Sequence, residues 1–443
     1  MNAIIASRAV SREQIVVNPS AAFQPFENGL ANAPEARSVM SMATLRAPGA
    51  PATVTAPSHI RASGARLLSL DVLRGITICF MIMVNNNGGP GSWWFMNHAQ
   101  WNGLTPTDLV FPTFLFVVGI TTVLSIEARL SRGATRAQLA WHTISRAAIL
   151  FCFGLIVNGF PYFALAHYRV YGVLQRIAIC YLVVGLFYLV DRSLWSKIAA
   201  VAACLFGYWI LVRWVPVPGA GVPTHDIPLL DPNRNMVNWL DQRIFPYHLY
   251  EDWTTHNLRD PEGLLSDIPS IATALLGVLT AFWLRTQKTV GQKAAGLLAA
   301  CVSCLAAGYF WSIWLPLNKK MWTSSYVLVA AGYSLLVLTI AYWAVEKIGI
   351  GKGRADWAVY PWLVFGSNAI VAYMFSELVP DAIENIHITA DGHRTNPTAW
   401  LVQHTLAHIP DRGVAAFAYS CIVAFVCFIP VWILYRRRIF VKI

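Results

Sequence analysis

The sequence predicts an all-α polytopic membrane protein, a bundle of about ten transmembrane helices. Three observations lead to this fold class: 56% of the 443 residues are hydrophobic, only 12% are charged, and the mean hydropathy is +0.51. Soluble domains carry about 25% charged residues. The composition therefore disfavours a water-soluble enzyme, a disordered protein and a secreted disulfide scaffold, and the environment it requires is a lipid bilayer.

The apolar stretches that follow Arg66 are long enough, or nearly so, to cross a bilayer, which takes about 20 helical residues. They centre on 67–87, 107–127, 138–158, 170–190, 195–215, 264–284, 291–313, 323–345, 357–377 and 413–435. Residues 397–409 form a shorter apolar segment, which we expect to be interfacial or re-entrant.

The first 65 residues differ from this pattern because they are rich in Ala, Pro, Ser and Arg. We expect a disordered cytoplasmic tail at 1–65, with Met40 or Met42 as an alternative start, and a transmembrane domain at 66–443.

Basic residues predict how the helices are oriented. With the amino terminus inside, the short inner loops hold fifteen Lys and Arg residues, and the much longer outer segments hold eight. Positive charge favours the cytoplasmic side, so we expect both termini inside. The same bias explains the net charge of +11, and no basic stripe with interleaved aromatic residues indicates a nucleic-acid partner.

Polar residues in the first span are the most informative part of the chain. Asp71, Arg74 and Asn85 fall within about 60° of one another on a helix, and the rise from Asp71 to Asn85 is about 21 Å. The Asp71–Arg74 pair fits a structural ion pair and a ligand role equally well. We expect Arg146 to reach the inner face and Arg176 to line a site deeper in the membrane.

The segment from Asn85 to Asp108 combines a run of three asparagines with four glycines, three tryptophans and one histidine. Irregular backbone near a membrane is tolerated where it lines a cavity. His98 is a candidate proton acceptor, although a lone histidine is more often structural. Residues 105–108 predict a capping box, and orienting His98 is a second role for Asp108.

Cysteine and histidine patterns indicate neither disulfides nor a metal. The eight cysteines all lie in apolar stretches, and Cys301 and Cys304 are expected to be ordinary buried thiols. His404 and His408 share a helix face but lack a third ligand at suitable spacing. Trp239, Tyr247 and Trp253 form an interfacial belt or, less favoured, a sugar platform.

Five motifs in this order resemble the heparan-α-glucosaminide N-acetyltransferase family. They are SLDVLRG at 69–75, NHAQWNGLTPTDLVFP at 97–112, GVLQR at 172–176, DPEGLLSDIPSI at 260–271 and LNKKMWTSSY at 317–326. The resemblance covers essentially 66–443. It is that of a bacterial-type member, because the luminal amino-terminal domain of the animal enzyme is missing.

The resemblance implies an enzyme that moves acetyl from cytosolic acetyl-CoA to the amino group of a glucosamine-type sugar on the opposite face of the bacterial inner membrane. Its catalytic residues would be His98, Asn85 and Asp108, with Asn86 or Asn87 as alternatives to Asn85. The positions expected to bind acetyl-CoA are Asp71, Arg74, Arg146 and Arg176. Those expected to bind the sugar are Trp101, Asn102, Asp260, Glu262, Asn318 and Lys319. No metal is expected, and a homodimer is implied by the resemblance alone.

Two alternatives remain open on the sequence. An amino-sugar or oligosaccharide transporter would have paired broken helices in two halves, and only one interrupted segment is evident. An O-acyltransferase of a surface glycan would share the donor machinery and differ in its acceptor. Direct transfer and an acetyl-histidine intermediate are likewise both compatible with the residues.

Overall fold

The computed structural model describes residues 67–441 except 90, 253–256, 259 and 391–392. The expected tail at 1–65 and the candidate aromatic residue Trp253 lie outside the described residues.

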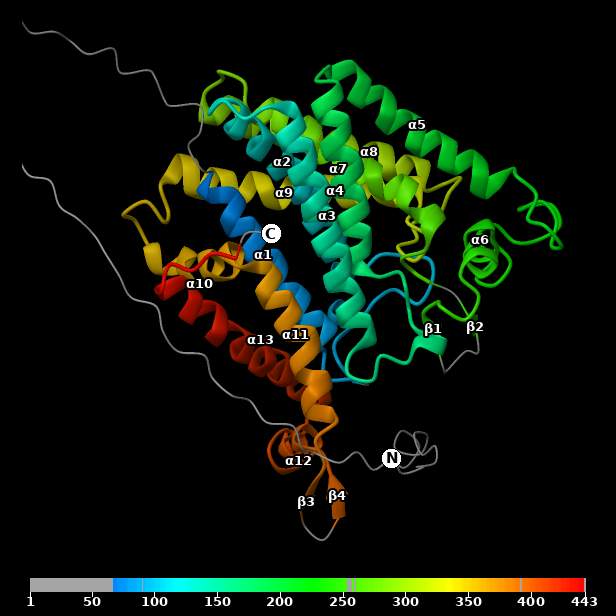
Figure 1. Cartoon of the computed structure of the whole chain (residues 1–443), viewed down its shortest axis with the longest axis vertical. Coiled ribbons are helices and arrows are strands. Elements are labelled where there is room, and N and C mark those ends of the chain that lie inside the picture. Colours follow the sequence, from blue (N-terminus) through cyan, green and yellow to red (C-terminus); the bar gives the residue numbers. More distant parts are fainter. Residues whose placement is uncertain (1–66, 90, 253–256, 259, 391–392, 442–443) are drawn as a thin grey trace, which may run out of the picture. The chain divides into compact units, whose positions relative to one another are not determined.

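Long apolar helices make up most of the described chain (Figure 1). Nine of the described helices are long and apolar enough to cross a membrane, and a bent pair makes a tenth crossing if it is counted as one span. The nine are α1 (Leu68–Asn85), α2 (Val110–Leu130), α3 (Arg136–Gly159), α4 (Val173–Val190), α5 (Leu194–Arg213), α7 (Asp267–Leu284), α8 (Val290–Trp311), α9 (Ser324–Tyr342) and α13 (Arg412–Arg436). An all-α polytopic fold with about ten spans is therefore confirmed.

The span expected at 357–377 is broken. This part of the chain forms two helices, α10 (Asp356–Ser367) and α11 (Ala369–Glu384), which meet at 75°. The break is stabilised from a distant part of the chain: Asn368 donates from Nδ2 to the carbonyl oxygen of Ile439 at 3.1 Å and accepts at Oδ1 from the backbone N–H of Val441 at 2.8 Å. Periodicity along the span carries no sign of these partners.

The two ends of the bundle differ in the length of their connections. At one end, the connections between spans are short, such as those from α2 to α3 and from α7 to α8. At the other, which we call the His98 end, they are long and carry the remaining elements. These are η1 (Trp94–Met96), η2 (Pro106–Leu109), η3 (Leu165–His167), α6 (Met236–Ile244), η4 (Leu264–Ser266), α12 (Pro397–His404), η6 (Leu406–His408) and two antiparallel hairpins, β1 (Glu251–Asp252) with β2 (Asn257–Leu258) and β3 (Ile388–Ala390) with β4 (His393–Thr395). The π-helix η5 (Trp343–Ile348) extends α9 at the short-loop end.

Burial separates an inner set of helices from an outer one. Most residues in the spans of α1, α2, α4, α7 and α9 are buried, whereas only 22–28% are buried in those of α3, α5, α8 and α13. Glycines allow close contact inside: a Cβ added to Gly75 of α1 would lie 1.8 Å from the carbonyl oxygen of Trp362 in α10. Small residues at such crossings are typical of helices packed in a membrane.

Candidate active site

His98 and Asp108 form a hydrogen-bonded pair at the His98 end. His98 lies in the connection between η1 and η2, and its Nδ1 is 2.7 Å from Oδ1 of Asp108. The other carboxylate oxygen accepts hydrogen bonds from the backbone N–H of Ala99 at 3.1 Å and from the N–H and hydroxyl of Thr105, each at 3.0 Å. The Asp108 side chain is 1% exposed, while 44% of the His98 side chain stays accessible.

The capping box predicted at residues 105–108 is present and opens η2, which leads into α2. The two expected geometries of Asp108, as a cap and as the partner of His98, therefore occur together. An ionised carboxylate only accepts hydrogen bonds, so Nδ1 of His98 carries the proton. The lone pair of the neutral imidazole is then on Nε2.

Lys319 lies over the imidazole ring. Its Nζ is 3.2 Å from Nδ1 and 3.3 Å from Nε2 of His98. An ammonium this close to both nitrogens must lie over the ring face, because an in-plane position between them would clash with the ring carbon that joins them. Burial first, and then the charge of Lys319, lower the pKa of His98 against the opposing effect of Asp108. The imidazole is therefore held neutral near pH 7.

The turn that carries Lys319 is bonded to the segment that carries His98. The backbone N–H of Gly103 donates to the carbonyl oxygen of Leu317 at 2.8 Å, and Lys320 donates to that of Gln100 at 2.7 Å. Asn318 and Asn102 bond through their amides at 3.0 Å. The structure thus brings Asn318 to Asn102, which is 216 residues away in sequence, and Lys319 to His98, which is 221 residues away.

The three consecutive asparagines after α1 have different partners. Asn85 donates to Oε1 of Glu377 in α11 at 2.9 Å, and Asn86 donates to the carbonyl oxygen of Ile82 in its own helix at 3.0 Å. Asn87 donates to Oδ1 of Asn97, the residue before His98, at 2.9 Å. Of the three, Asn87 is the one whose amide contacts the segment holding the histidine.

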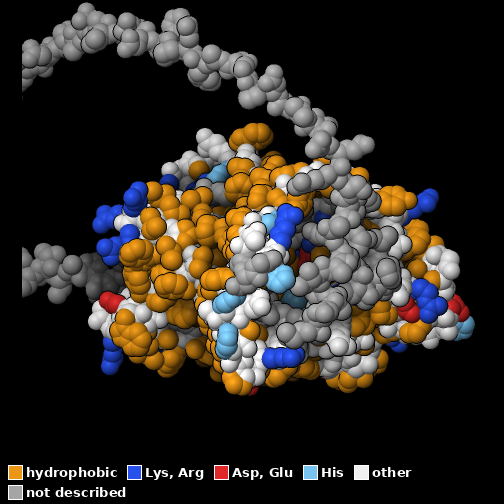
Figure 2. Space-filling model, turned by 90° about the horizontal axis from the view of Figure 1, so that it is seen from below, with side chains coloured by type: hydrophobic (Ala, Val, Ile, Leu, Met, Phe, Trp, Pro, Cys, Tyr) orange, Lys and Arg blue, Asp and Glu red, His pale blue; other side chains and the backbone are white. Residues whose placement is uncertain are grey.

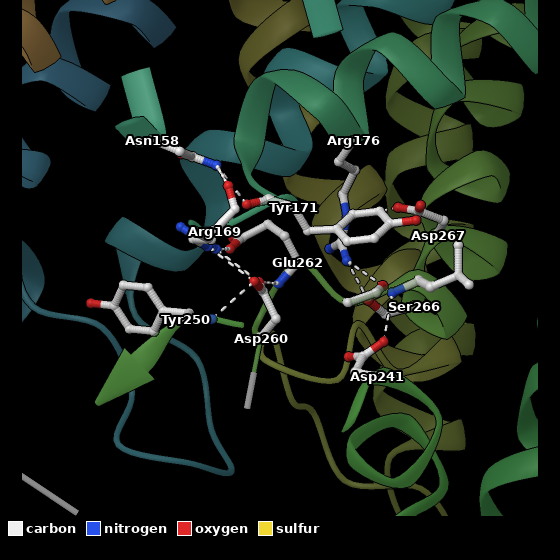
Figure 3. Close-up of polar contacts among 12 residues, drawn as sticks. Asn158, Arg169, Tyr171, Arg176, Asp241, Tyr250, Asp260, Glu262, Ser266 and Asp267 are labelled. Atoms are coloured by element: carbon white, nitrogen blue, oxygen red, sulfur yellow. Dashed lines mark hydrogen bonds and ion pairs between the residues drawn. The ribbon is translucent and has the colours of Figure 1, made fainter. Parts of the chain in front are cut away.

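A second polar network, beside the His98–Asp108 pair, connects the segment that precedes α4 with the segment that precedes α7 (Figure 3). Arg169 binds Asp260 through Nε at 3.0 Å and Nη2 at 2.8 Å, and it binds Glu262 through Nη2 at 2.6 Å. The ring of Tyr250 lies 4.7 Å from the guanidinium carbon. The carboxylates of Asp260 and Glu262 raise the pKa of Arg169 above the ordinary value of an arginine.

Arg176 is completely buried at the start of α4. Its Nε lies 3.1 Å from Oδ1 of Asp267, and its Nη2 donates to the carbonyl oxygen of Gly263 at 3.2 Å and to the hydroxyl of Ser266. Asp241 of α6 joins this cluster by accepting from the backbone N–H of Leu264 at 3.0 Å (Figure 3). Burial raises the pKa of Asp241 to about 7.

The residues expected to bind acetyl-CoA do not form one group. Asp71 and Arg74 lie toward the short-loop end, 3.8 Å apart, and Arg74 also donates to the carbonyl oxygen of Gly366 at 3.4 Å. The guanidinium of Arg146 lies over the ring of Tyr181 at 4.8 Å, between α3 and α4. Arg176 belongs to the His98 end, where it is bonded to protein groups.

Several positions expected to bind the sugar are bonded within the protein. Asp260 and Asn318 are 2% and 0% exposed, and Trp101 donates from Nε1 to the carbonyl oxygen of Leu230 at 2.7 Å. These three hold connections in place. Lys319 contacts the imidazole of His98, and the charge of Glu262 also acts on it.

Four residues of these networks were missed in the sequence: Arg169, Asp241, Asp267 and Glu377. A signal existed for Glu377, since a carboxylate at the end of an apolar span is costly and commonly functional. Asp267 lies in a quoted motif but resembled a helix-start acid. Arg169 and Asp241 lie in polar connections, where charge is ordinary and carries no signal.

The surface of the face that carries α12 and the β3–β4 hairpin is mainly hydrophobic toward its edges (Figure 2). Histidine and basic side chains gather near its middle, beside a hollow. Among the described residues, no group of three His, Cys, Asp or Glu side chains has the arrangement that a metal ion requires.

The fold and this site define a class: an all-helical multi-pass membrane protein with an accessible histidine, held by a buried carboxylate, at one end of the bundle. A family model described as "Heparan-alpha-glucosaminide N-acetyltransferase, catalytic" matches residues 66–218. The chain is 28% identical to the human heparan-alpha-glucosaminide N-acetyltransferase over 434 residues, which is 85% of this chain and 60% of the relative. The mouse protein of the same name is 28% identical over 444 residues, 87% of this chain and 62% of the relative.

The chain is thus similar to heparan-alpha-glucosaminide N-acetyltransferases over most of its length. The matched region spans about three fifths of the length of these two relatives.

Proposed function

We propose that this chain is a transmembrane N-acetyltransferase that moves acetyl from acetyl-CoA to the amino group of a glucosamine-type sugar. The observation that carries the proposal is the His98–Asp108 pair: a carboxylate 1% exposed bonds Nδ1 at 2.7 Å and leaves Nε2 of an accessible, neutral imidazole as a base. A general base must reach the proton that it removes and have a pKa near the working pH. The lowered pKa of His98 leaves its imidazole neutral and able to accept a proton, and its accessibility permits the first condition.

In the proposed reaction, the acceptor ammonium first loses a proton to water. The neutral sugar nitrogen then attacks the thioester carbonyl carbon while Nε2 of His98 takes a proton from that nitrogen. The tetrahedral intermediate then collapses, the carbon–sulfur bond breaks, and the imidazolium returns the proton to the leaving thiolate. Asp108 keeps the proton on Nδ1 throughout and stabilises the imidazolium. An acetyl-histidine intermediate would use the same nitrogen as the nucleophile.

We assign the oxyanion contact to Asn87. Its amide donates to Oδ1 of Asn97, next to His98, and to the carbonyl oxygen of Met96, so the oxyanion would displace one of these acceptors. Asn85 is instead bonded to Glu377 and Asn86 to its own helix. In other enzymes, one amide donor to a tetrahedral oxyanion contributes about 10²–10³ in kcat.

The donor and acceptor are proposed to approach from opposite ends. Arg74 and the basic residues of the short-loop end suit the phosphates of acetyl-CoA, with the pantetheine arm running along α1 toward His98. The carboxylate of Glu262 suits an amino sugar, which is cationic at neutral pH. Both termini would be cytoplasmic and the protein would lie in the bacterial inner membrane, as a monomer or homodimer.

The test uses the full chain purified in detergent, acetyl-CoA labelled in the acetyl group, and glucosamine as the acceptor. Label in N-acetylglucosamine is counted for wild type, His98→Ala, Asn87→Ala and Asn86→Ala. We expect transfer by wild type, loss below detection in His98→Ala, a fall of about 10²–10³-fold in Asn87→Ala, and little change in Asn86→Ala.

The α10–α11 break gives the transporter alternative one specific observation, because it adds an interrupted helix to the irregular segment after α1. Liposomes carrying the protein separate the two functions. Glucosamine uptake without acetyl-CoA, undiminished in His98→Ala, would refute the acetyltransferase and support transport.

A further inference from the structure

Arg176 is bonded to protein groups through Nε and Nη2, and only its buried Nη1 has no hydrogen-bond partner among the described residues. Its guanidinium is fixed by Asp267, by the carbonyl oxygen of Gly263 and by the hydroxyl of Ser266, and the side chain is 0% exposed. Such a charge is costly to bury unless its partners are in place. The contacts of Arg176 with its neighbours show which part of the structure it supports.

The guanidinium lies over the indole of Trp322, with its central carbon 4.8 Å from the ring centroid. Trp322 is also 0% exposed, and its Nε1 donates to the hydroxyl of Thr273 at 3.1 Å. Its backbone has a φ of +52°, a conformation that a bulky residue adopts only when its surroundings hold it there. Arg176 and Thr273 fix the indole from two sides.

Trp322 closes the turn that presents Lys319. Its backbone N–H donates to the carbonyl oxygen of Lys319 at 3.0 Å, and the N–H of Thr323 donates to that of Asn318 at 3.1 Å. The Lys319 ammonium then lies over His98 at 3.2–3.3 Å from its two nitrogens. A continuous set of contacts therefore joins the Arg176–Asp267 pair to the imidazole.

We propose that Arg176 is a positioning residue: by holding Trp322 in its left-handed conformation, it keeps the ammonium of Lys319 over the ring of His98. The inference rests on the proposed function for its kinetic readout. It assigns Arg176 no contact with acetyl-CoA, and it gives Lys319 the role of keeping His98 unprotonated.

The direction of the effect follows from the groups that face each partner. Asp108, Glu262 and Lys319 act on His98, and Lys319 lowers its pKa while the two carboxylates raise it. Glu262, Asp108, Lys320 and Arg176 act on Lys319, whose own pKa is lowered, chiefly by burial. If Lys319 leaves the ring, the pKa of His98 rises and the base becomes protonated at a higher pH.

The test is the pH dependence of kcat/KM for glucosamine acetylation by the full chain in detergent. We expect Lys319→Met to move the acidic limb up by about one pH unit, which lowers kcat/KM about tenfold below the limb. Arg176→Lys keeps the charge but cannot make the same three bonds and stack, so its limb should move in the same direction. In the double variant the limb should move no further than in Lys319→Met. Ionisation of the acceptor amine is common to all variants and cancels in the comparison.

Arg213→Gln is the matched control. Arg213 also pairs with an indole, that of Trp214 at 5.5 Å, and donates to the carbonyl oxygen of Trp314 at 3.1 Å. Its limb should match that of wild type. Trp322→Phe, which loses only the larger ring and the bond to Thr273, replaces Arg176→Lys if that variant does not fold.

A second readout does not need the reaction. Diethyl pyrocarbonate modifies neutral imidazole, so the pH midpoint of modification, taken as the difference between each protein and its His98→Gln version, reports the pKa of His98. We expect the same upward shifts. An Arg176→Lys limb and midpoint equal to those of wild type, or shifts that add in the double variant, would overturn the inference. Absence of acetylation by wild type would instead count against the proposed function, and the midpoints would still decide the positioning role.

Discussion

At the scale of single residues, the carboxylate of Asp108 does the work of two groups. One oxygen holds Nδ1 of His98, and the other accepts three hydrogen bonds that close the turn before α2. The capping box follows from local spacing in the sequence, and pairing with His98 was expected beside it. The pairing depends on the turn at residues 98–105, which brings the imidazole of His98 next to the carboxylate of the capping box.

Replacing Asp108 with Asn should lower kcat by roughly 10²–10⁴-fold, because an amide can donate to Nδ1 and so favour the wrong tautomer. The acetylation assay measures this directly. Asp226→Asn is the control, since His225 and Asp226 form a similar pair at 2.6 Å on an exposed connection, and its activity should stay at the wild-type level. Equal activity of Asp108→Asn and wild type would remove His98 from the role of oriented base.

At the scale of helices, the close crossing of α1 and α10 places the Asp71–Arg74 pair next to the α10–α11 break. Gly75 and Gly366 are the contact points: a Cβ on Gly366 would lie 2.1 Å from the carbonyl oxygen of Asp71. Both glycines are visible in the sequence, yet neither reveals its partner helix. The crossing is a property of the folded bundle.

Gly75→Ala should therefore lower the free energy of unfolding by about 1–3 kcal/mol or more, because the backbone of α10 cannot yield as a flexible side chain would. Thermal unfolding in detergent measures this. Gly207→Ala in α5 is the matched control: a Cβ there meets no atom within 4 Å, and alanine should stabilise that helix by about 0.5–1 kcal/mol. A Gly75→Ala protein as stable as Gly207→Ala would mean that the crossing is looser than described.

At the scale of the whole molecule, the sequence was sufficient for most of the fold and for part of the site. Nine of the ten predicted spans are helices close to their expected bounds, because hydropathy reports burial in lipid directly. The break at Asn368 was not predictable, since the backbone of residues 439 and 441 stabilises it from about seventy residues away. The choice among Asn85, Asn86 and Asn87 stays a prediction, because three identical neighbours differ only in their tertiary partners.

The distribution of basic residues predicts which end of the bundle faces outward. With both termini cytoplasmic, the His98 end faces outward and the short loops face inward. A membrane-impermeant maleimide should label Asp226→Cys in cells with a permeable outer membrane, and should label Ser131→Cys only after the inner membrane is opened. Label on the native cysteines is subtracted with wild type. Reversed labelling would place the histidine on the side of acetyl-CoA synthesis and would require a different route for the acceptor.

The bonds between Asn368 and the backbone of Ile439 and Val441 also bear on how the protein is handled in the laboratory. The segment after α13 is hydrogen-bonded to the α10–α11 break, so an affinity tag fused directly after the chain, close to Val441, would disturb these bonds. A tag placed before residue 67, or separated from Val441 by a long flexible linker, leaves the bonds of Asn368 intact.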